Sequence, residues 1–240
     1  MAARATMIDF ARPARKNLVL LAAIVVMQVA QPLLGHRSVE AGAFFDIVFA
    51  VICLYVFFVV FARRWQRRVA LTLVLPAAVG NVARYLLPPS AHLWPAVAFH
   101  CSVVVFLGFA VAVILGDIFR KRVISADDVI GALCGYLLGA LVWANLYTLT
   151  YLLYPEAFVV RPEIAWRLGH WHLRRALFDY LSFTTLTGLG YSDISPGGPP
   201  VYSLTWMEVI FGQFYMAVVV AQLVGLKLAQ AMKGDGPEST

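Results

Sequence analysis

Six apolar stretches of roughly twenty residues restrict what this sequence can fold into more than any other feature. A helix rises about 1.5 Å per residue and the hydrocarbon core of a bilayer is about 30 Å thick, so about twenty apolar residues cross it. The sequence therefore predicts six transmembrane helices. They run approximately over residues 17 to 35, 42 to 62, 69 to 88, 93 to 116, 129 to 153 and 204 to 232.

The composition excludes most classes of soluble protein. Hydrophobic residues make up 61% of the chain and charged residues only 13%, whereas soluble domains carry about a quarter charged residues. So little charge cannot cover the surface of a soluble enzyme, a disordered tail or a nucleic-acid binder. Cys53, Cys101 and Cys134 each lie in an apolar run, which favours small buried side chains over a disulfide or metal site. We expect a lipid bilayer as the surroundings, no nucleic-acid partner and no soluble ligand domain.

Basic residues indicate which side of the membrane each loop faces. Most of the 19 Lys and Arg residues lie at the N-terminus, after the second and fourth apolar runs, or at the end of the sixth. Cytoplasmic loops are enriched in Lys and Arg. We therefore expect a multi-pass protein of the cell (inner) membrane with both termini in the cytoplasm. The residues that carry this bias are Arg4, Arg12, Arg15, Lys16, Arg63, Arg64, Arg67, Arg68, Arg120, Lys121, Arg122, Lys227 and Lys233.

A polar linker, residues 117 to 128, divides the chain into two predicted domains. Residues 1 to 128 form a peripheral domain of four transmembrane helices. The fourth apolar run of this domain contains no Arg or Lys, so it lacks the arginine ladder of a voltage sensor. Residues 129 to 233 form the second domain, and residues 234 to 240 form a short cytoplasmic tail.

A segment between the fifth and sixth apolar runs has a different pattern. From Ala176 to Thr187 the sequence predicts a helix of about 18 Å, roughly half a membrane. Gly188 and Gly190 follow, and then come Asp193 and a Gly-Pro cluster typical of a loop. Irregular backbone at membrane depth must be buried in protein or line a watery path, because lipid cannot satisfy its carbonyls and amides. The pattern predicts a re-entrant segment whose carbonyl oxygens can replace the hydration shell of a cation.

This segment resembles a known family. Residues 184 to 193 read Thr-Thr-Leu-Thr-Gly-Leu-Gly-Tyr-Ser-Asp and are similar to the pore loop of tetrameric potassium channels, whose filter reads T-V-G-Y-G followed by Asp. The preceding helix, Phe178 to Thr187, and the following helix with Glu208 also resemble that family, so the resemblance covers roughly residues 129 to 232. It implies an all-α membrane protein with six transmembrane helices plus a re-entrant pore helix and filter loop between helices five and six.

The resemblance implies a passive potassium-selective channel rather than an enzyme, with no cofactor other than permeant K⁺. One chain has one filter segment and a ring of carbonyls needs four, so the implied working unit is a homotetramer. Thr184 and Thr185 would support the pore helix. The resemblance places K⁺ at the backbone carbonyls of Gly188, Leu189, Gly190 and Tyr191. The ion-conducting residues that it implies are Thr187, Gly188, Leu189, Gly190, Tyr191, Ser192 and Asp193.

Two departures from the family pattern leave alternatives open. Gly188 stands where the family has Thr, so the innermost ion site would have carbonyls alone, and Ser192 replaces a glycine at the outer mouth. A nonselective monovalent cation channel on the same architecture is therefore an alternative. A secondary transporter is a further alternative, although it would normally show interrupted helices in both halves, and only one re-entrant segment is visible.

Several residues outside the loop are candidates for a structural or functional role. Asp46, Asn81, Arg84 and His100 are expected at similar depth in the outer half of the membrane, where they would form a polar cluster built on an Asp46 to Arg84 ion pair. A structural role is favoured over sensing.

Glycines and an extracellular stretch complete the sequence predictions. Gly131, Gly135 and Gly139 share one helix face and predict close helix packing, and Gly212 is a candidate gating hinge. Residues 161 to 175 are expected to form an extracellular turret whose histidines, His170 and His172, would titrate near neutral pH.

Overall fold

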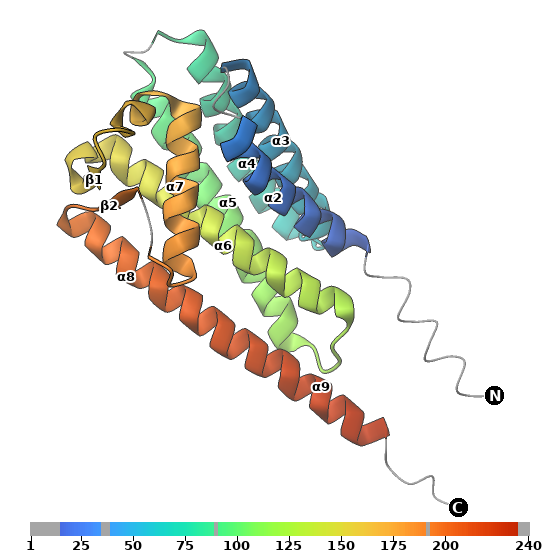
Figure 1. Cartoon of the computed structure of the whole chain (residues 1–240). Helices are drawn as coiled ribbons and strands as arrows, with labels where there is room; N and C mark the ends of the chain where they lie inside the picture. Colours follow the sequence, from blue (N-terminus) through green and yellow to red (C-terminus); the bar gives the residue numbers. More distant parts are fainter. Residues whose placement is uncertain (1–14, 35–38, 89–90, 191–192, 235–240) are drawn as a thin grey trace, which may run out of the picture.

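A computed structural model of the chain describes residues 15–34, 39–88, 91–190 and 193–234, most of them in α-helix (Figure 1). A shorter helix, α7 (Trp171–Leu186), lies between the fifth and the last of the long helices. The last long helix has three parts, which are α8 (Pro199–Phe214), a π-helical turn (Tyr215–Val219) and α9 (Val220–Gly234). The first long helices are α2 (Arg15–Leu34), α3 (Val39–Val59), α4 (Arg64–Leu86), α5 (Leu93–Arg120) and α6 (Ala126–Leu153).

Five helical stretches in the described residues are long and apolar enough to cross a bilayer, which indicates a multi-pass membrane protein with an all-α fold. The predicted third span, residues 69 to 88, lies in helix α4, which is not among the five. The side chains of Arg84 and Tyr85 near the end of α4 lie outside the described residues. The five stretches are Lys16–Leu34, Glu40–Val59, Leu93–Arg120, Ala126–Leu153 and Pro199–Gln230.

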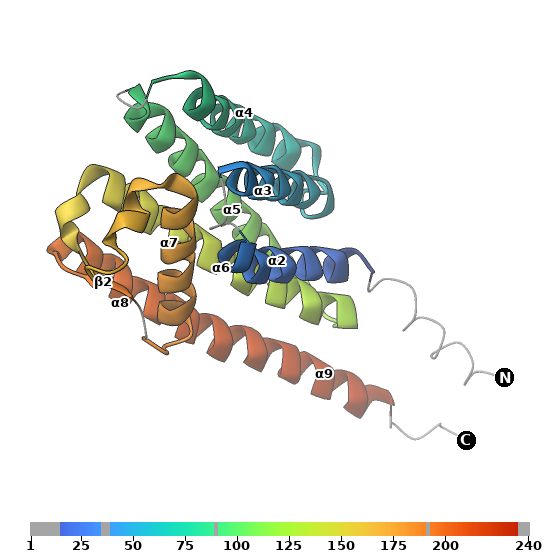
Figure 2. The ribbon, with the colours of Figure 1, turned by 45° about the horizontal axis from the view of Figure 1, so that its top comes forward.

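Several helix ends and turns lie together at one end of the molecule (Figure 1). Helix α2 begins and helix α9 ends at the same end of the molecule (Figures 1 and 2). The turn between α5 and α6, which carries Lys121 and Arg122, lies at that end too (Figure 1). The predicted N-terminal and C-terminal segments, residues 1–14 and 235–240, lie outside the described residues.

Helix α6 lies between the peripheral helices and the long α8 to α9 helix (Figures 1 and 2). Its Leu138 is buried in the same apolar core as Ile24 of α2, Phe49 of α3 and Leu107 of α5. Lipid is as apolar as these side chains, so close packing rather than water exclusion holds such helices together. The core therefore runs without interruption from the peripheral helices into the predicted pore domain.

The linker between α5 and α6 is shorter than the sequence predicts. Helix α5 continues to Arg120 and helix α6 begins at Ala126, so the linker spans residues 121–125 rather than 117–128. Helix α6 begins early because Ser125 and Asp128 form a reciprocal cap, in which the Ser125 amide donates to Asp128 Oδ2 at 2.9 Å and the Asp128 amide donates to Ser125 Oγ at 3.3 Å. Acidic side chains in the first turn also stabilise a helix N-terminus.

The glycine face of α6 packs closely, as predicted. A Cβ on Gly135 would lie 2.6 Å from the Tyr215 hydroxyl, and a Cβ on Gly139 would lie 2.8 Å from the Phe211 ring. A Cβ on Gly131 would lie 3.1 Å from the Asn17 amide nitrogen. Glycine at these three positions therefore lets α6 approach both α2 and the last long helix (α8, the π turn and α9), which we call the inner helix.

Short elements connect α6 to α7 and α7 to α8 at the outer end. Strand β1 (Phe158–Val160) pairs antiparallel with β2 (Ile194–Pro196), with Val160 opposite Ile194. The sequence analysis does not predict this two-stranded ribbon, because each strand has only three residues and one contains a proline. Two short 3₁₀ helices, Pro155–Ala157 and Ala165–Gly169, complete the connection.

Helix α7 begins earlier than predicted. It runs from Trp171 to Leu186, about 24 Å by helical rise, so the last residues of the expected turret form its first turns. His172 is therefore buried rather than on a solvent-exposed turret. Burial lowers the pKa of His172 from its ordinary value, and the neighbouring His170 acts in the same direction, although Asp46 opposes them.

Candidate functional site

Threonine hydroxyls near the end of helix α7 form hydrogen bonds with carbonyl oxygens of the same helix. The Thr184 hydroxyl donates to the Tyr180 carbonyl oxygen at 2.9 Å, and the Thr187 hydroxyl donates to the Phe183 carbonyl oxygen at 2.7 Å. These hydroxyls therefore bond within their own helix. Thr185 is buried, and its carbonyl oxygen accepts from the Gly188 amide at 3.0 Å. The bonds close the helix where the glycines begin.

Gly188 and Gly190 give the loop after α7 its course. Their φ angles are +75° and +72°, in the left-handed region that costs other L-residues roughly 1–2 kcal/mol. The Gly190 amide donates to the Thr184 carbonyl oxygen at 3.1 Å, so both glycine amides turn back toward the helix. The two glycines that sequence reasoning selected are thus the residues that reverse the chain.

The carbonyl oxygens of this loop remain available. Residues 187–190 are exposed, with 58% of Leu189 accessible. No hydrogen bond joins the carbonyl oxygens of these four residues to any other described residue. A loop at membrane depth whose amides are bonded and whose carbonyls are open offers oxygen ligands to a cation. Tyr191 and Ser192, the other two predicted filter residues, lie outside the described residues.

After the two residues that lie outside the described ranges, Asp193 is held by contacts with Arg161. The Asp193 carboxylate forms an ion pair with Arg161, and the Arg161 amide donates to the Asp193 carbonyl oxygen at 3.3 Å. Strand β2 begins with the next residue, so the ribbon of β1 and β2 fixes this side of the loop. The sequence pattern places Arg161 in a turret and does not predict its pairing with Asp193.

Glu208 of α8 anchors the back of helix α7. Its side chain is fully buried, the Tyr147 hydroxyl donates to Oε2 at 2.6 Å, and the Ser182 hydroxyl lies 2.5 Å from Oε1. The Ser182 hydroxyl also lies 2.7 Å from the Ala140 carbonyl oxygen. One carboxylate therefore links α6, α7 and α8.

Gly212 packs against the end of α7. A Cβ at this position would lie 2.2 Å from the Leu186 carbonyl oxygen, so only glycine permits the approach of α8 to the pore helix. The Tyr136 hydroxyl donates to the same carbonyl oxygen at 3.3 Å. The structure gives Gly212 a packing role, whereas its predicted role as a hinge stays a prediction.

A π-helical turn interrupts the inner helix directly after this contact. It spans Tyr215–Val219, and the Tyr215 hydroxyl donates to the Ala132 carbonyl oxygen at 2.6 Å. Single π turns inside α-helices are frequent at functional sites. The apolar pattern of this helix does not predict the turn.

Two members of the predicted polar cluster have partners on other helices. Asp46 Oδ1 accepts from Arg175 Nη1 at 3.3 Å, and His100 Nδ1 lies 2.8 Å from Asn145 Oδ1. Asn81 lines an apolar pocket that Asp46 also borders. The Arg84 side chain lies outside the described residues, so the expected Asp46 to Arg84 pair stays a prediction.

Comparisons of this chain with family models, with curated proteins and with solved structures find no match. The resemblance to potassium channels therefore rests on the residues of the pore loop and its flanking helices, and it stays a prediction.

Proposed function

We propose that the chain forms a passive potassium channel of the cell membrane in which four copies place residues 187–190 around a common axis. One observation carries this proposal: Gly188 and Gly190, at positive φ, follow a short helix and leave the carbonyl oxygens of an exposed loop without partners among the described residues. Rings of such oxygens can replace the hydration shell of K⁺.

The surroundings of the loop support a pore function. Helix α7 is shorter than the spanning helices, and the Glu208 contacts hold it in place. Helix α8 exposes large apolar side chains, among them Trp206, Ile210 and Phe214. An apolar face of this size fits contact with neighbouring copies or with lipid. The predicted filter is incomplete in one copy, so a tetramer is part of the proposal.

A nonselective monovalent cation channel is the second candidate. Gly188 favours it, because this residue has no hydroxyl and offers only its backbone oxygen at the innermost position. The two candidates share the architecture and differ in the discrimination between K⁺ and Na⁺.

Ion flux in proteoliposomes tests the proposal. Purified protein is reconstituted into vesicles loaded with K⁺ or with Na⁺, and efflux is measured after an opposing gradient is imposed. The proposal predicts K⁺ efflux well above Na⁺ efflux and no dependence on a coupling ion. Equal fluxes support the nonselective channel, and flux that requires a second ion gradient supports a transporter instead.

A further inference from the structure

Arg175 is a largely buried charged residue in the first half of helix α7. The guanidinium stays charged at any physiological pH, and its side chain is only 16% exposed. A charge in such surroundings persists only where it is paired. The partners of the Arg175 guanidinium therefore indicate which helices this residue connects.

Helix α3 supplies two of those partners. Arg175 Nη1 lies 3.3 Å from Asp46 Oδ1, and Arg175 Cζ lies 4.2 Å from the centre of the Phe49 ring. Asp46 and Phe49 are three residues apart and so lie on one face of α3. The guanidinium is thus held by a carboxylate and by an aromatic ring of the same peripheral helix.

The third partner belongs to α7 itself. Arg175 Nε lies 3.8 Å from Asp179 Oδ2, one helical turn further along. Asp179 is buried, and its Oδ2 has no hydrogen-bond partner among the described residues. We call Asp46, Phe49, Arg175 and Asp179 the Arg175 clamp.

The clamp joins the peripheral domain to the pore helix. Among the described residues, four ion pairs are present, and only Asp46 with Arg175 connects helices α2 to α5 with helix α7. Close packing accompanies it, because a Cβ on Gly42 would lie 2.8 Å from the Cβ of His172. Helix α3 is therefore held to the first turns of α7 by packing and by charge.

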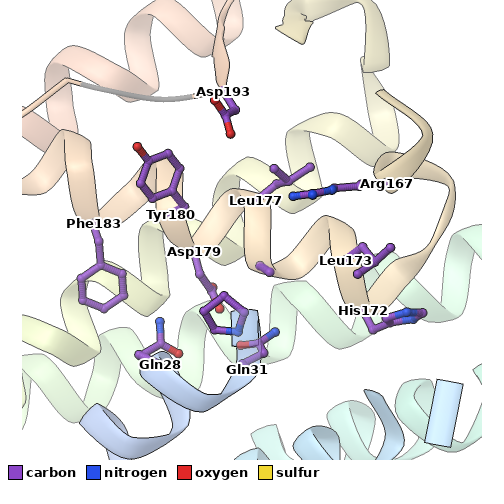
Figure 3. A pocket seen from close by; sticks show the side chains of 12 residues that line it. Gln28, Gln31, Arg167, His172, Leu173, Leu177, Asp179, Tyr180, Phe183 and Asp193 are labelled. Carbon is purple, nitrogen blue, oxygen red and sulfur yellow. The ribbon is translucent and has the colours of Figure 1, made fainter. Parts of the chain in front are cut away.

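On the α2 side, helix α7 borders a pocket next to its contacts with α2. The pocket has a volume of about 520 Å³, and Gln28 and Gln31 of α2 line it together with Asp179 (Figure 3). A helix with empty space on one side can tilt, whereas close-packed interiors resist displacement. The position of the first half of α7 therefore depends on its contacts with α3 and with α6, where Arg174 Cζ lies 5.6 Å from the centre of the Tyr151 ring.

We infer that the Arg175 clamp is the element through which the peripheral domain positions the pore loop, an inference that rests on the proposed channel function for its effect on ions. A helix transmits displacement along its axis, and Arg175 lies about 18 Å from Thr187 by helical rise. The contact between Ser182 and Glu208 lies between Arg175 and Thr187 along the helix, and it is the point about which α7 tilts. Release of the clamp tilts α7 and disturbs the bonds from Gly188 and Gly190 to the helix end.

Amide hydrogen exchange tests this inference without any ion flux. The variants Asp46→Asn and Arg175→Gln each remove the ion pair between α3 and α7, and exchange at residues 184–190 is expected to rise roughly tenfold. The double variant is expected to match either single variant, because the two residues act as a pair. Lys121→Gln is the matched control, since it removes the ion pair with Asp128 in the α5 to α6 linker and should leave exchange in the loop unchanged.

Ion selectivity supplies the second readout. In vesicles where the native protein carries K⁺, the two variants are expected to lower the preference for K⁺ over Na⁺ several-fold, with partial recovery in Arg175→Lys. If the native protein carries no K⁺, the channel proposal fails, and the exchange experiment still decides the inference.

Unchanged exchange at residues 184–190 in folded Asp46→Asn and Arg175→Gln overturns the inference. If these variants do not fold, Asp46→Glu replaces them, because it keeps the charge and shifts it by one methylene group. Faster exchange than in the native protein then supports the clamp, and exchange at the native rate contradicts it.

Discussion

At the scale of single residues, the proposed pore depends on a few side chains and two backbone angles. Gly188 and Gly190 turn the chain at positive φ, and Glu208 accepts hydrogen bonds from two helices. Each feature is local, so one substitution addresses it.

Gly190→Ala is expected to impair conduction through backbone strain alone. Apart from its chain neighbours, no described residue lies within 4 Å of the added Cβ, but φ is +72°, and a non-glycine residue there costs roughly 1–2 kcal/mol. Potassium flux in vesicles should fall at least tenfold, with folding largely retained. Gly169→Ala is the control, because that glycine also has open space and lacks a positive φ. Native flux in Gly190→Ala would contradict a conducting role for this residue.

Glu208→Ala is expected to destabilise the fold. The change removes the acceptor of the Tyr147 hydroxyl, whereas the Ser182 hydroxyl keeps the Ala140 carbonyl oxygen, so the cost is about 1–3 kcal/mol. Thermal unfolding in detergent should show a clear loss of stability, and Tyr147→Phe should show a smaller one. Glu156→Ala, at an exposed position, provides the control and should unfold as the native protein does. Equal melting of Glu208→Ala and the control would rule out the anchoring role.

Prediction from sequence succeeds at this scale where the chemistry is local. Gly188 and Gly190 are identifiable because two glycines directly after a Thr-rich half-helix form an unusual pattern in a membrane protein. Arg175 is misassigned to a turret because its partner Asp46 lies 129 positions away, and no spacing rule connects residues at that separation.

At the scale of elements, helix α7 is held from three directions. Helix α3 contacts its first turns through Asp46, helix α8 contacts its middle through Glu208, and Tyr136 of α6 contacts its last carbonyl. The inner helix contacts that end at Gly212. The position of the loop is thus a property of several helices together.

Gly212→Ala is expected to separate α8 from the end of α7. The added Cβ would lie 2.2 Å from a backbone oxygen, which cannot move aside as a flexible side chain can. We expect loss of ion flux and a loss of stability of about 1–3 kcal/mol, as for overpacked cores. Gly225→Ala on the same long helix is the matched control, because open space surrounds that glycine. If both variants conduct and melt alike, the close contact does not exist in the working protein.

The elements are predictable to different degrees. Long apolar runs predict helices where α2 to α6 and the inner helix occur, because composition over twenty residues is a strong signal. The start of α7 at Trp171 is missed because its first turns are polar and resemble a loop. The β1 to β2 ribbon and the π turn at Tyr215–Val219 depend on tertiary contacts, which no short sequence window contains.

At the scale of the whole molecule, the fold places an exposed loop at the end of a short helix, next to helices long and apolar enough to cross a membrane. The peripheral helices share a core with α6 and hold α7 through the Arg175 clamp. In the proposed channel, these four helices, which lack a voltage-sensing arginine ladder, position the loop through contact rather than through a charge that moves in the membrane field.

The most direct measurement for the central claim is an anomalous difference map from crystals of the assembled protein grown in Tl⁺, which substitutes for K⁺. The proposed channel predicts four chains around one axis, with Tl⁺ peaks on that axis within coordination distance of the carbonyl oxygens of residues 188–190. A map that places these residues far from any rotation axis, or that shows no Tl⁺ beside them, would contradict it.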